Sequence, residues 1–287
     1  MNRRAAALGL RFLGYTPARK TTPDDETMAI ATHEKFVEYY EKQSLTDGTL
    51  IRFQSQMERI LALRGGAGEG LRVLDLGCAT GSNAAIWASA GHEVIGIDIS
   101  AELVAIASRR ASADRLNARF LVGSAEQIPV AAGWADIVLA PELLEHVPDW
   151  QGCLSEIVRV LKPGGAVFLS TTNTLCPYQQ EYNLPLFSWY PRALKRRVIE
   201  LTKSSRPELA NYAPFPAVNW FNFYTLRAAL EANGLDGVRG PFDLPLSHWS
   251  ARKRWIARMI RRHRLARLAA CVAFSGTQVY ALKPATG

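Results

Sequence analysis

Short, continuous runs of apolar residues divide the middle of the chain and predict the strands of a parallel sheet. Each run is four to six residues long and alternates too little for a strand with one side in solvent, which favours strands buried on both faces. The segments between the runs have helical composition. The predicted strands are residues 71–76, 93–97, 120–123, 136–140 and 166–170, the last one following a turn at 162–165.

Strands that alternate with helices over 71–172 predict an α/β fold with a doubly wound, mostly parallel sheet, whose ligands lie at the carboxyl ends of the strands. The rest of the chain flanks this core. We expect a basic tail at 1–26, a helical cap at 27–70, an aromatic-rich insertion with one helix (191–203) at 173–224, and a C-terminal part of the core at 225–287. This last part includes a helix at 226–233, a basic amphipathic helix at 251–267 and an antiparallel edge strand at 278–282.

The first predicted strand runs directly into a glycine-bearing turn, Val-Leu-Asp-Leu-Gly-Cys-Ala-Thr-Gly at 73–81. Gly77 and Gly81 lack Cβ atoms, which permits unusual backbone angles and close approach of a ligand. From Ser82 the composition is helical, so the turn opens into a helix N-terminus. Asp98 ends the second strand, where a carboxylate is placed to accept the two hydroxyls of a ribose. Together these residues predict a nucleotide-type cofactor site.

The glycine spacing narrows the choice of cofactor. A dinucleotide fingerprint needs a middle glycine, and none lies between Gly77 and Gly81. An acid two residues before a G-x-x-x-G loop resembles the class I S-adenosylmethionine-dependent methyltransferases, of the type 11 group. The resemblance implies a Rossmann-like, seven-stranded sheet and S-adenosylmethionine as cofactor. It implies cofactor contacts from Asp75, Gly77, Cys78, Ala79, Gly81, Asp98, Ile99, Ser124, Ala125, Glu126 and Pro141. Ser124 stands where that family usually has an aspartate near the adenine.

The segment after the fourth predicted strand carries the candidate chemistry. Glu142, Glu145 and His146 lie at i, i+3 and i+4, and on a helical turn this spacing puts all three on one face. Such a face suits a general base or a divalent cation such as Mg²⁺. The segment resembles that of the ubiquinone-biosynthesis O-methyltransferases, where the matching residues are associated with a metal. A purely structural or cofactor-lining role for these residues stays open.

The insertion at 173–224 is dense in aromatic residues and lies after the fifth predicted strand. Its position predicts a lid over the acceptor pocket, with Asn173, Tyr178, Trp189 and Trp220 as candidate acceptor contacts. In the ubiquinone-type enzymes the corresponding insertion is linked to membrane contact. The alternative is a small satellite core beneath a long loop. In the predicted cap, Tyr39 or Tyr40 is a further candidate for reaching the cleft.

Charge separates the ends of the chain from its core. The net charge is +8, yet 1–23 and 252–267 contain many Lys and Arg residues and no acid. In the second segment Trp255, Ile256, Met259 and Ile260 fall on one side of a helix and arginines on the other, a pattern that suits an anionic bilayer surface. Nucleic acid is the weaker alternative, because no recognisable nucleic-acid module accompanies the basic stripe. A solvated arginine face is the third interpretation.

The four cysteines lack paired spacing, and no apolar run is long enough to span a bilayer, so we expect a cytoplasmic protein, peripheral on a membrane if at all.

The hypothesis is O-methylation of a hydrophobic or lipid-linked hydroxyl compound. One alternative is an RNA or protein N-methyltransferase, but Pro141-Glu142-Leu143-Leu144 stands where a nitrogen-specific Asn/Asp-Pro-Pro-Tyr/Phe motif is common. The other is a non-catalytic, membrane-associated scaffold.

Overall fold

The computed structural model describes residues 37, 41, 45–66, 68–210, 213, 215–244, 246–247 and 249–285. The predicted basic tail, most of the cap before residue 45, and the candidates Tyr39 and Tyr40 lie outside these residues. Within them, no helix is long and apolar enough to cross a membrane.

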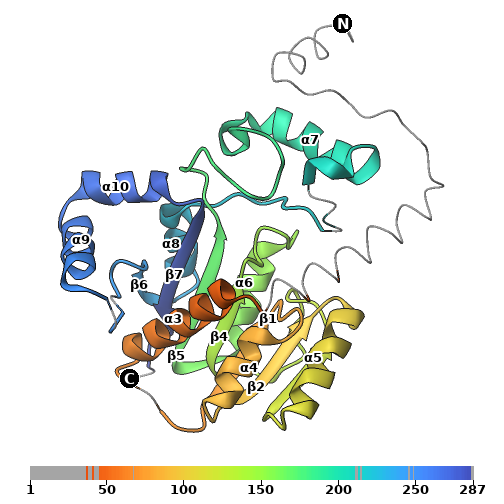
Figure 1. Cartoon of the computed structure of the whole chain (residues 1–287), viewed down its shortest axis with the longest axis vertical. Helices are drawn as coiled ribbons and strands as arrows, with labels where there is room; N and C mark the ends of the chain where they lie inside the picture. Colours follow the sequence, from red (N-terminus) through yellow and green to blue (C-terminus); the bar gives the residue numbers. More distant parts are fainter. Residues whose placement is uncertain are drawn as a thin grey trace, which may run out of the picture.

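A seven-stranded sheet forms the centre of the molecule (Figure 1). The strand order is β3-β2-β1-β4-β5-β7-β6, with parallel pairing from β3 to β5 and antiparallel pairing of β7 with both neighbours. The predicted α/β fold with a mostly parallel sheet is therefore confirmed. The strands are β1 (Arg72–Leu76), β2 (Glu93–Asp98), β3 (Ala118–Val122), β4 (Ala135–Pro141), β5 (Leu161–Thr172), β6 (Asp236–Arg239) and β7 (Gly276–Leu282).

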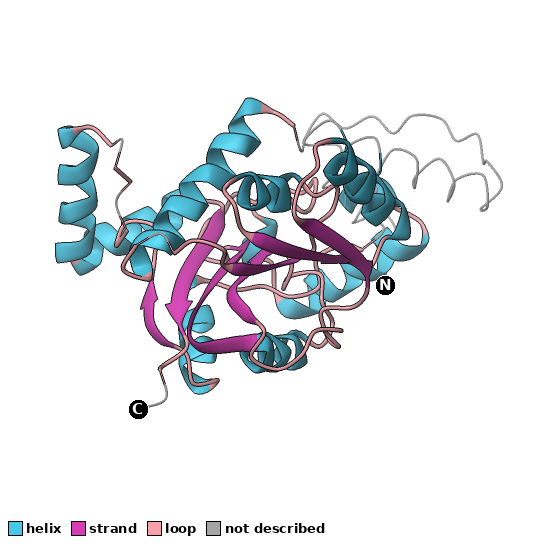
Figure 2. Ribbon diagram, turned by 90° about the horizontal axis from the view of Figure 1, so that it is seen from below, coloured by secondary structure: helices cyan, strands magenta, loops and turns pink. Residues whose placement is uncertain are grey.

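Helices cover both faces of the sheet, which explains why the central strands read as unbroken apolar runs (Figure 2). On one face pack α3 (Asp47–Leu63), α4 (Ser82–Ser89) and α5 (Ala101–Ala113), and on the other α6 (Trp150–Val160) and α8 (Phe223–Ala232). Trp87 of α4 and Ile60 of α3 are fully buried against the first face, and Leu154 and Leu226 against the second. These two cores hold rigid the strand ends from which the site is built.

Three sequence predictions about the sheet and its surroundings are wrong. The strand predicted at 278–282 is antiparallel but not an edge, because β7 is buried and pairs along its whole length with β5 and at its far end with β6. The short, charged β6 takes the edge, as suits an exposed strand. The turn predicted at 162–165 lies inside β5, where the register with β4 shifts between Leu161 and Ala166.

The third error concerns the helix predicted at 251–267. It is two helices, α9 (Ala251–Arg262) and α10 (Arg264–Ala273), separated by the extended residue His263. No Gly or Pro marks the break, so the sequence pattern runs through it. The direction of α10 is instead set by distant contacts, such as the 3.1 Å ion pair of Arg267 with Asp243.

The aromatic insertion forms a small hydrophobic cluster of its own. Tyr182 and Phe187 stack at 4.3 Å between ring centroids, and both contact Trp220. The helix predicted at 191–203 is α7 (Arg192–Ser204), which adds Val198 to the cluster. Two 3₁₀ helices, η1 (Phe187–Trp189) and η2 (Pro207–Ala210), complete the segment. Backbone N–H groups of Val218 and Asn219 donate to the Glu145 carbonyl, which ties the insertion to the carboxyl end of β4.

Candidate functional site

The turn between β1 and α4 is held in the left-handed backbone region at three positions. Gly77 has φ +69°, Ala79 φ +46° and Gly81 φ +81°. A Cβ at Gly81 would lie 2.9 Å from both the Ala107 Cβ and the Phe120 ring, so glycine is required here by packing as well as by backbone angle. We expected this glycine to admit a ligand. In the structure its missing Cβ instead lets α5 and β3 pack closely against the turn.

Asp98 fixes the same turn from the end of β2. Its Oδ2 accepts a 2.9 Å hydrogen bond from the Ala79 N–H, and its Oδ1 accepts one of 2.9 Å from Ser100 N–H. Burial raises the pKa of Asp98 above its ordinary value, against the lowering effect of these N–H donors. Asp98 therefore holds the glycine turn, and each of its oxygens keeps a lone pair for a further donor.

Asp75 lies beneath the turn near the Ala84 N–H and the Asn83 amide, yet neither carboxylate oxygen has a partner with hydrogen-bond geometry among the described residues. It is only 1% exposed, and burial, aided by the nearby charge of Asp98, raises its pKa to about 7. Buried polar groups are normally paired, so an orphaned carboxyl facing a cleft marks a place for a ligand.

The cleft that contains Asp75 has a volume of about 570 Å³. It is bounded by the glycine turn, the ends of β4 and β5, α3 and the start of the insertion. Four more of its lining residues bury side-chain polar atoms without a partner among the described residues, so the cleft is built for a polar ligand. These residues are Ser82, Asn83, Glu145 and Thr171.

The predicted Glu142, Glu145 and His146 face does not exist. Glu142 has φ +51°, so the chain leaves β4 in a turn rather than a helix. Its carboxylate instead pairs with Arg52 of α3 at 2.8 Å. Glu145 is buried, and burial, followed by the nearby acids Glu181 and Glu142, holds its pKa well above its usual range. A raised pKa favours the protonated carboxyl, which disfavours Glu145 as a general base.

The predicted metal site is also wrong. Among the described residues, no group of three or more His, Cys, Asp or Glu side chains is arranged to hold a metal ion. The three candidates diverge, because Glu142 turns to Arg52 and His146 turns to Glu181 of the insertion.

Glu181 is the residue that the sequence analysis missed. Its carboxylate lies 3.9 Å from His146 Nε2 and lines the cleft. Burial, with the charge of Glu142, raises its pKa to about 7, while burial lowers the pKa of His146. Both shifts favour the uncharged form of the group concerned. No motif surrounds Glu181 in the sequence, so only the fold reveals it.

The four candidate acceptor contacts do not line this cleft. The Asn173 amide donates to the carbonyls of Cys271 (2.5 Å) and Phe274 (2.7 Å), which gives it a structural role. Tyr178 and Trp189 are 74% and 57% exposed, and Trp220 belongs to the cluster of the insertion. After β5 and in the insertion, the residues that do line the cleft include Thr171, Thr172 and Gln179. The two threonines end a strand, a position that the fold rule alone would have indicated.

The predicted adenine contacts also lie outside the lining of the cleft. Ser124 Oγ accepts from the N–H of Glu126 at 3.1 Å, and Glu126 Oε1 accepts from the N–H of Asp149 at 2.8 Å. Ala125 packs against the core, whereas Ile99 is exposed. Of the other predicted cofactor contacts, Gly77, Cys78, Ala79 and Pro141 line the cleft.

Comparison with known proteins identifies the core that carries this cleft. Residues 74–169 match the family model described as a methyltransferase domain. This core is similar to a methyltransferase domain. The matched stretch begins in β1 and ends in β5, so it contains the glycine turn, Asp98 and the segment after β4.

Two curated relatives and one solved structure are similar to this core. The chain is 37% identical over 114 residues to a malonyl-[acyl-carrier protein] O-methyltransferase of Pectobacterium atrosepticum, covering 40% of this chain and 43% of that protein. It is 37% identical over 105 residues to a ubiquinone biosynthesis O-methyltransferase of Rhizobium etli, covering 37% and 42%. The match therefore spans less than half the length of these relatives. A methyltransferase of Aquifex aeolicus described as SAM-dependent shares the fold, with a TM-score of 0.52, 16% identity and coverage of 86% and 98%.

The buried Asp75 carboxyl predicts a pH-dependent stability. Its pKa of about 7 in the folded state lies above the ordinary value near 4 of the unfolded chain, so its ionisation destabilises the fold as pH rises between these values. We expect Asp75→Asn to raise the free energy of unfolding in urea, and the gain at pH 8 to exceed the gain at pH 5 by roughly 2–3 kcal/mol. Exposed Asp114→Asn is the control. An equal gain at both pH values for Asp75→Asn would contradict the assignment.

Proposed function

We propose that this chain is an S-adenosylmethionine-dependent O-methyltransferase that acts on a hydrophobic or lipid-linked hydroxyl compound. The observation that carries the proposal is the cleft itself, which brings the orphaned Asp75 and the glycine turn together with Glu181, whose carboxylate contacts His146 behind the lining. The printed names of the two relatives, both O-methyltransferases, support the type of reaction.

The residues of the cleft fit a cofactor that carries positive charge and hydroxyl groups. Asp75 is buried without a partner, and Asp98 keeps acceptor capacity next to the turn. In the proposed complex Asp75 and the turn at 77–80 hold the amino acid portion of the cofactor, and Asp98 accepts the ribose hydroxyls. Ile99 and Ser124 flank the adenine. The bound cofactor supplies a methyl group on a sulfonium sulfur, which is transferred by in-line displacement.

The acceptor hydroxyl must lose its proton as its oxygen bonds to the methyl carbon. In our proposal Glu181 takes this proton, because its pKa of about 7 lies in the range where a base works best at neutral pH. Neutral His146 stands beside it and orients the carboxylate. Glu145 is buried, and its raised pKa favours the form that donates a hydrogen bond within the cleft.

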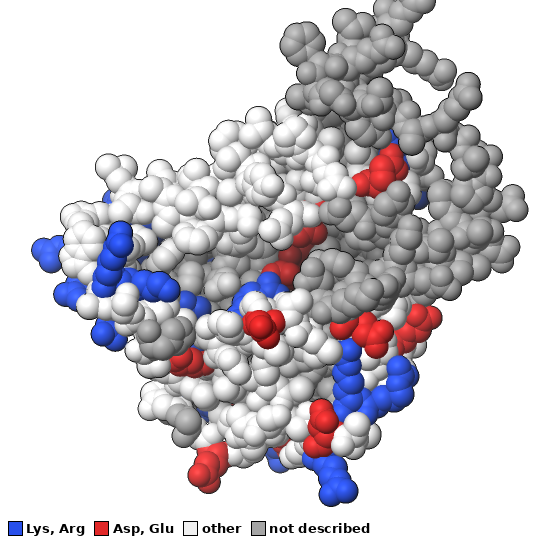
Figure 3. All heavy atoms as spheres, viewed as in Figure 1, with Lys and Arg blue, Asp and Glu red and all other residues white. Residues whose placement is uncertain are grey.

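A membrane surface is the proposed place of encounter with the acceptor. Exposed apolar side chains of α9 and α10 lie among arginines, as in Trp255, Met259 and Leu265, the last 81% exposed. Figure 3 shows the basic residues gathered over these helices. Apolar side chains can enter a bilayer while the arginines attract anionic headgroups, each adding about 1 kcal/mol near the surface.

We expect Asp98→Ala to lose cofactor affinity. Removal of two charge-assisted hydrogen bonds, together with the tether to Ala79, should weaken binding of S-adenosylmethionine on the order of 100-fold or more. Isothermal titration calorimetry measures this loss. Exposed Asp114→Ala should bind as the wild type does. Unchanged affinity in Asp98→Ala would refute the cofactor assignment.

We expect Glu181→Gln to bind the cofactor normally but to slow methyl transfer by a factor on the order of 100 to 10,000. The assay uses methyl-labelled S-adenosylmethionine with separated lipid and aqueous cell extracts, and follows label in each fraction. In the wild type the rate should rise through about pH 7 as Glu181 ionises, and this rise should vanish in the variant. Exposed Glu200→Gln is the matched control. Label found only in the aqueous fraction would overturn the lipid-linked acceptor.

We expect the chain to float with vesicles that contain anionic phosphatidylglycerol and less with neutral phosphatidylcholine vesicles. Replacing Trp255 and Leu265 together by Ser should reduce flotation at least tenfold, because both side chains lie on the proposed contact surface. A pair of exposed apolar residues elsewhere, Ile51 and Val122, provides the control when replaced by Ser. Equal flotation of the two double variants would contradict the surface proposed here.

A further inference from the structure

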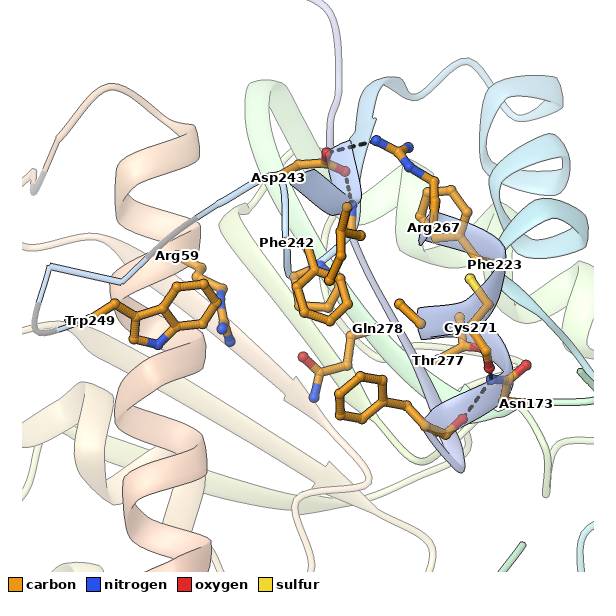
Figure 4. A pocket seen from close by; sticks show the side chains of 16 residues that line it. Arg59, Asn173, Phe223, Phe242, Asp243, Trp249, Arg267, Cys271, Thr277 and Gln278 are labelled. Atoms are coloured by element: carbon orange, nitrogen blue, oxygen red, sulfur yellow. Dashed lines mark hydrogen bonds and ion pairs between the residues drawn. The ribbon is translucent and has the colours of Figure 1, made fainter. Parts of the chain in front are cut away.

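A second pocket, of about 340 Å³, lies next to the methyltransferase cleft (Figure 4). Its walls come from α3, the start of β7, the loop after β6 and the inner sides of α9 and α10. The exposed surface of the lining is largely apolar and includes four aromatic rings, with Phe242 and Phe274 5.6 Å apart between ring centroids. Other members include Phe223, Trp249, Ile260 and Ala270.

Polar contacts at the wall hold this pocket open. Asp243 accepts from Arg267 at 3.1 Å and from the Gly240 N–H at 2.9 Å. Arg59 donates through Nε to the Leu244 carbonyl at 3.1 Å and stacks over Trp249 at 5.5 Å. Figure 4 shows these groups around the space. The wall is thus cross-linked by hydrogen bonds and an ion pair, which oppose collapse of the loop onto the helices.

The two cavities differ in the ligand that they suit. Five residues of the cleft bury polar atoms that have no partner among the described residues, whereas no described residue lining the second pocket does so. An unpaired buried polar atom is costly unless a ligand satisfies it, and an apolar pocket without such atoms suits a hydrocarbon. The second pocket therefore matches an apolar group and the cleft a polar one.

The pocket adjoins the cleft along β7. Gly276 lines both cavities, and the neighbouring Ser275 lines the cleft. A third cavity of about 120 Å³ lies between them, sharing Arg59 and Gln278 with the pocket and Phe53 with the cleft. On its outer side the pocket is walled by α9 and α10, the helices with exposed apolar side chains, and Phe274 belongs both to its lining and to that surface.

We propose that this pocket binds the hydrocarbon chain of the acceptor, while the hydroxyl-bearing head reaches the cleft past Gly276. The inference rests on the proposed function and deepens it, since it names an acceptor with a polar head and a single apolar tail. It also gives the inner sides of α9 and α10 a role that their basic outer surface does not explain.

Ala270 offers a test of this site. It is buried and lines the pocket from α10, so Ala270→Leu fills the space with a residue that favours helix, while Ala269→Leu changes an exposed position of the same helix. The probe is 11-(dansylamino)undecanoic acid, a fluorescent fatty acid, titrated against the full-length protein. We expect micromolar binding by the wild type and by Ala269→Leu, and at least a tenfold loss in Ala270→Leu. Equal binding by all three, or by none, would overturn the proposal.

Controls separate this outcome from a folding defect and from failure of the proposed function. Thermal melting should show Ala270→Leu about as stable as the wild type or more stable, because the leucine extends into an existing cavity. If that variant does not fold, quenching of tryptophan fluorescence by 9,10-dibromostearic acid replaces it, and Trp249→Phe should remove most of the quenching. No loss of quenching in Trp249→Phe would also refute the site.

Fatty-acid binding without any transfer of labelled methyl would count against the enzymatic function, whereas methylated lipid without fatty-acid binding would count against the pocket.

Discussion

The hydrogen bond from the Ala79 N–H to the Asp98 carboxylate joins the ends of the first two strands and fixes the turn on which the rest of the site is built. The N–H groups of Gly77 and Cys78 both donate to the Ile97 carbonyl, so the turn is tied to β2 at three points. Its position determines where α4 begins and where Asp75 lies buried. The other contributors, from α3, β4, β5 and the insertion, are arranged around this fixed element.

The cleft buries several carboxyl groups, and their burial lowers the stability of the fold. Asp75, Glu145 and Glu181 each have a raised pKa, and burial is the main cause in all three. Arg52 compensates Glu142, but that pair is largely exposed and contributes little. The hydrophobic core on each face of the sheet offsets the free-energy cost of burying these carboxyl groups. A cationic ligand would reduce that cost. Buried carboxyl groups with shifted pKa values are common at binding sites, because groups that are placed to contact a ligand cannot also pair with one another.

The sequence predicted most of the sheet because its central strands are buried on both faces, and such strands appear as unbroken apolar runs. It predicted the glycine turn and Asp98 because local spacing determines both. It could not predict that Glu142 adopts a positive φ, which destroys the helical face assumed for Glu145 and His146. Nor could it find Glu181, whose role depends on how an insertion of irregular structure folds back over β4.

The interior position of β7 has a consequence for the order in which the molecule can fold. Among the described strands β7 is synthesised last, yet it lies between β5 and β6 and pairs with β5 from Ala166 to Thr172. On the ribosome, β5 therefore leaves the N–H and C=O groups of one edge without their β7 partners while more than a hundred further residues are made. Such an open strand is prone to wrong pairing with another chain. This strand order therefore favours completion of the sheet only after the last described strand has been made.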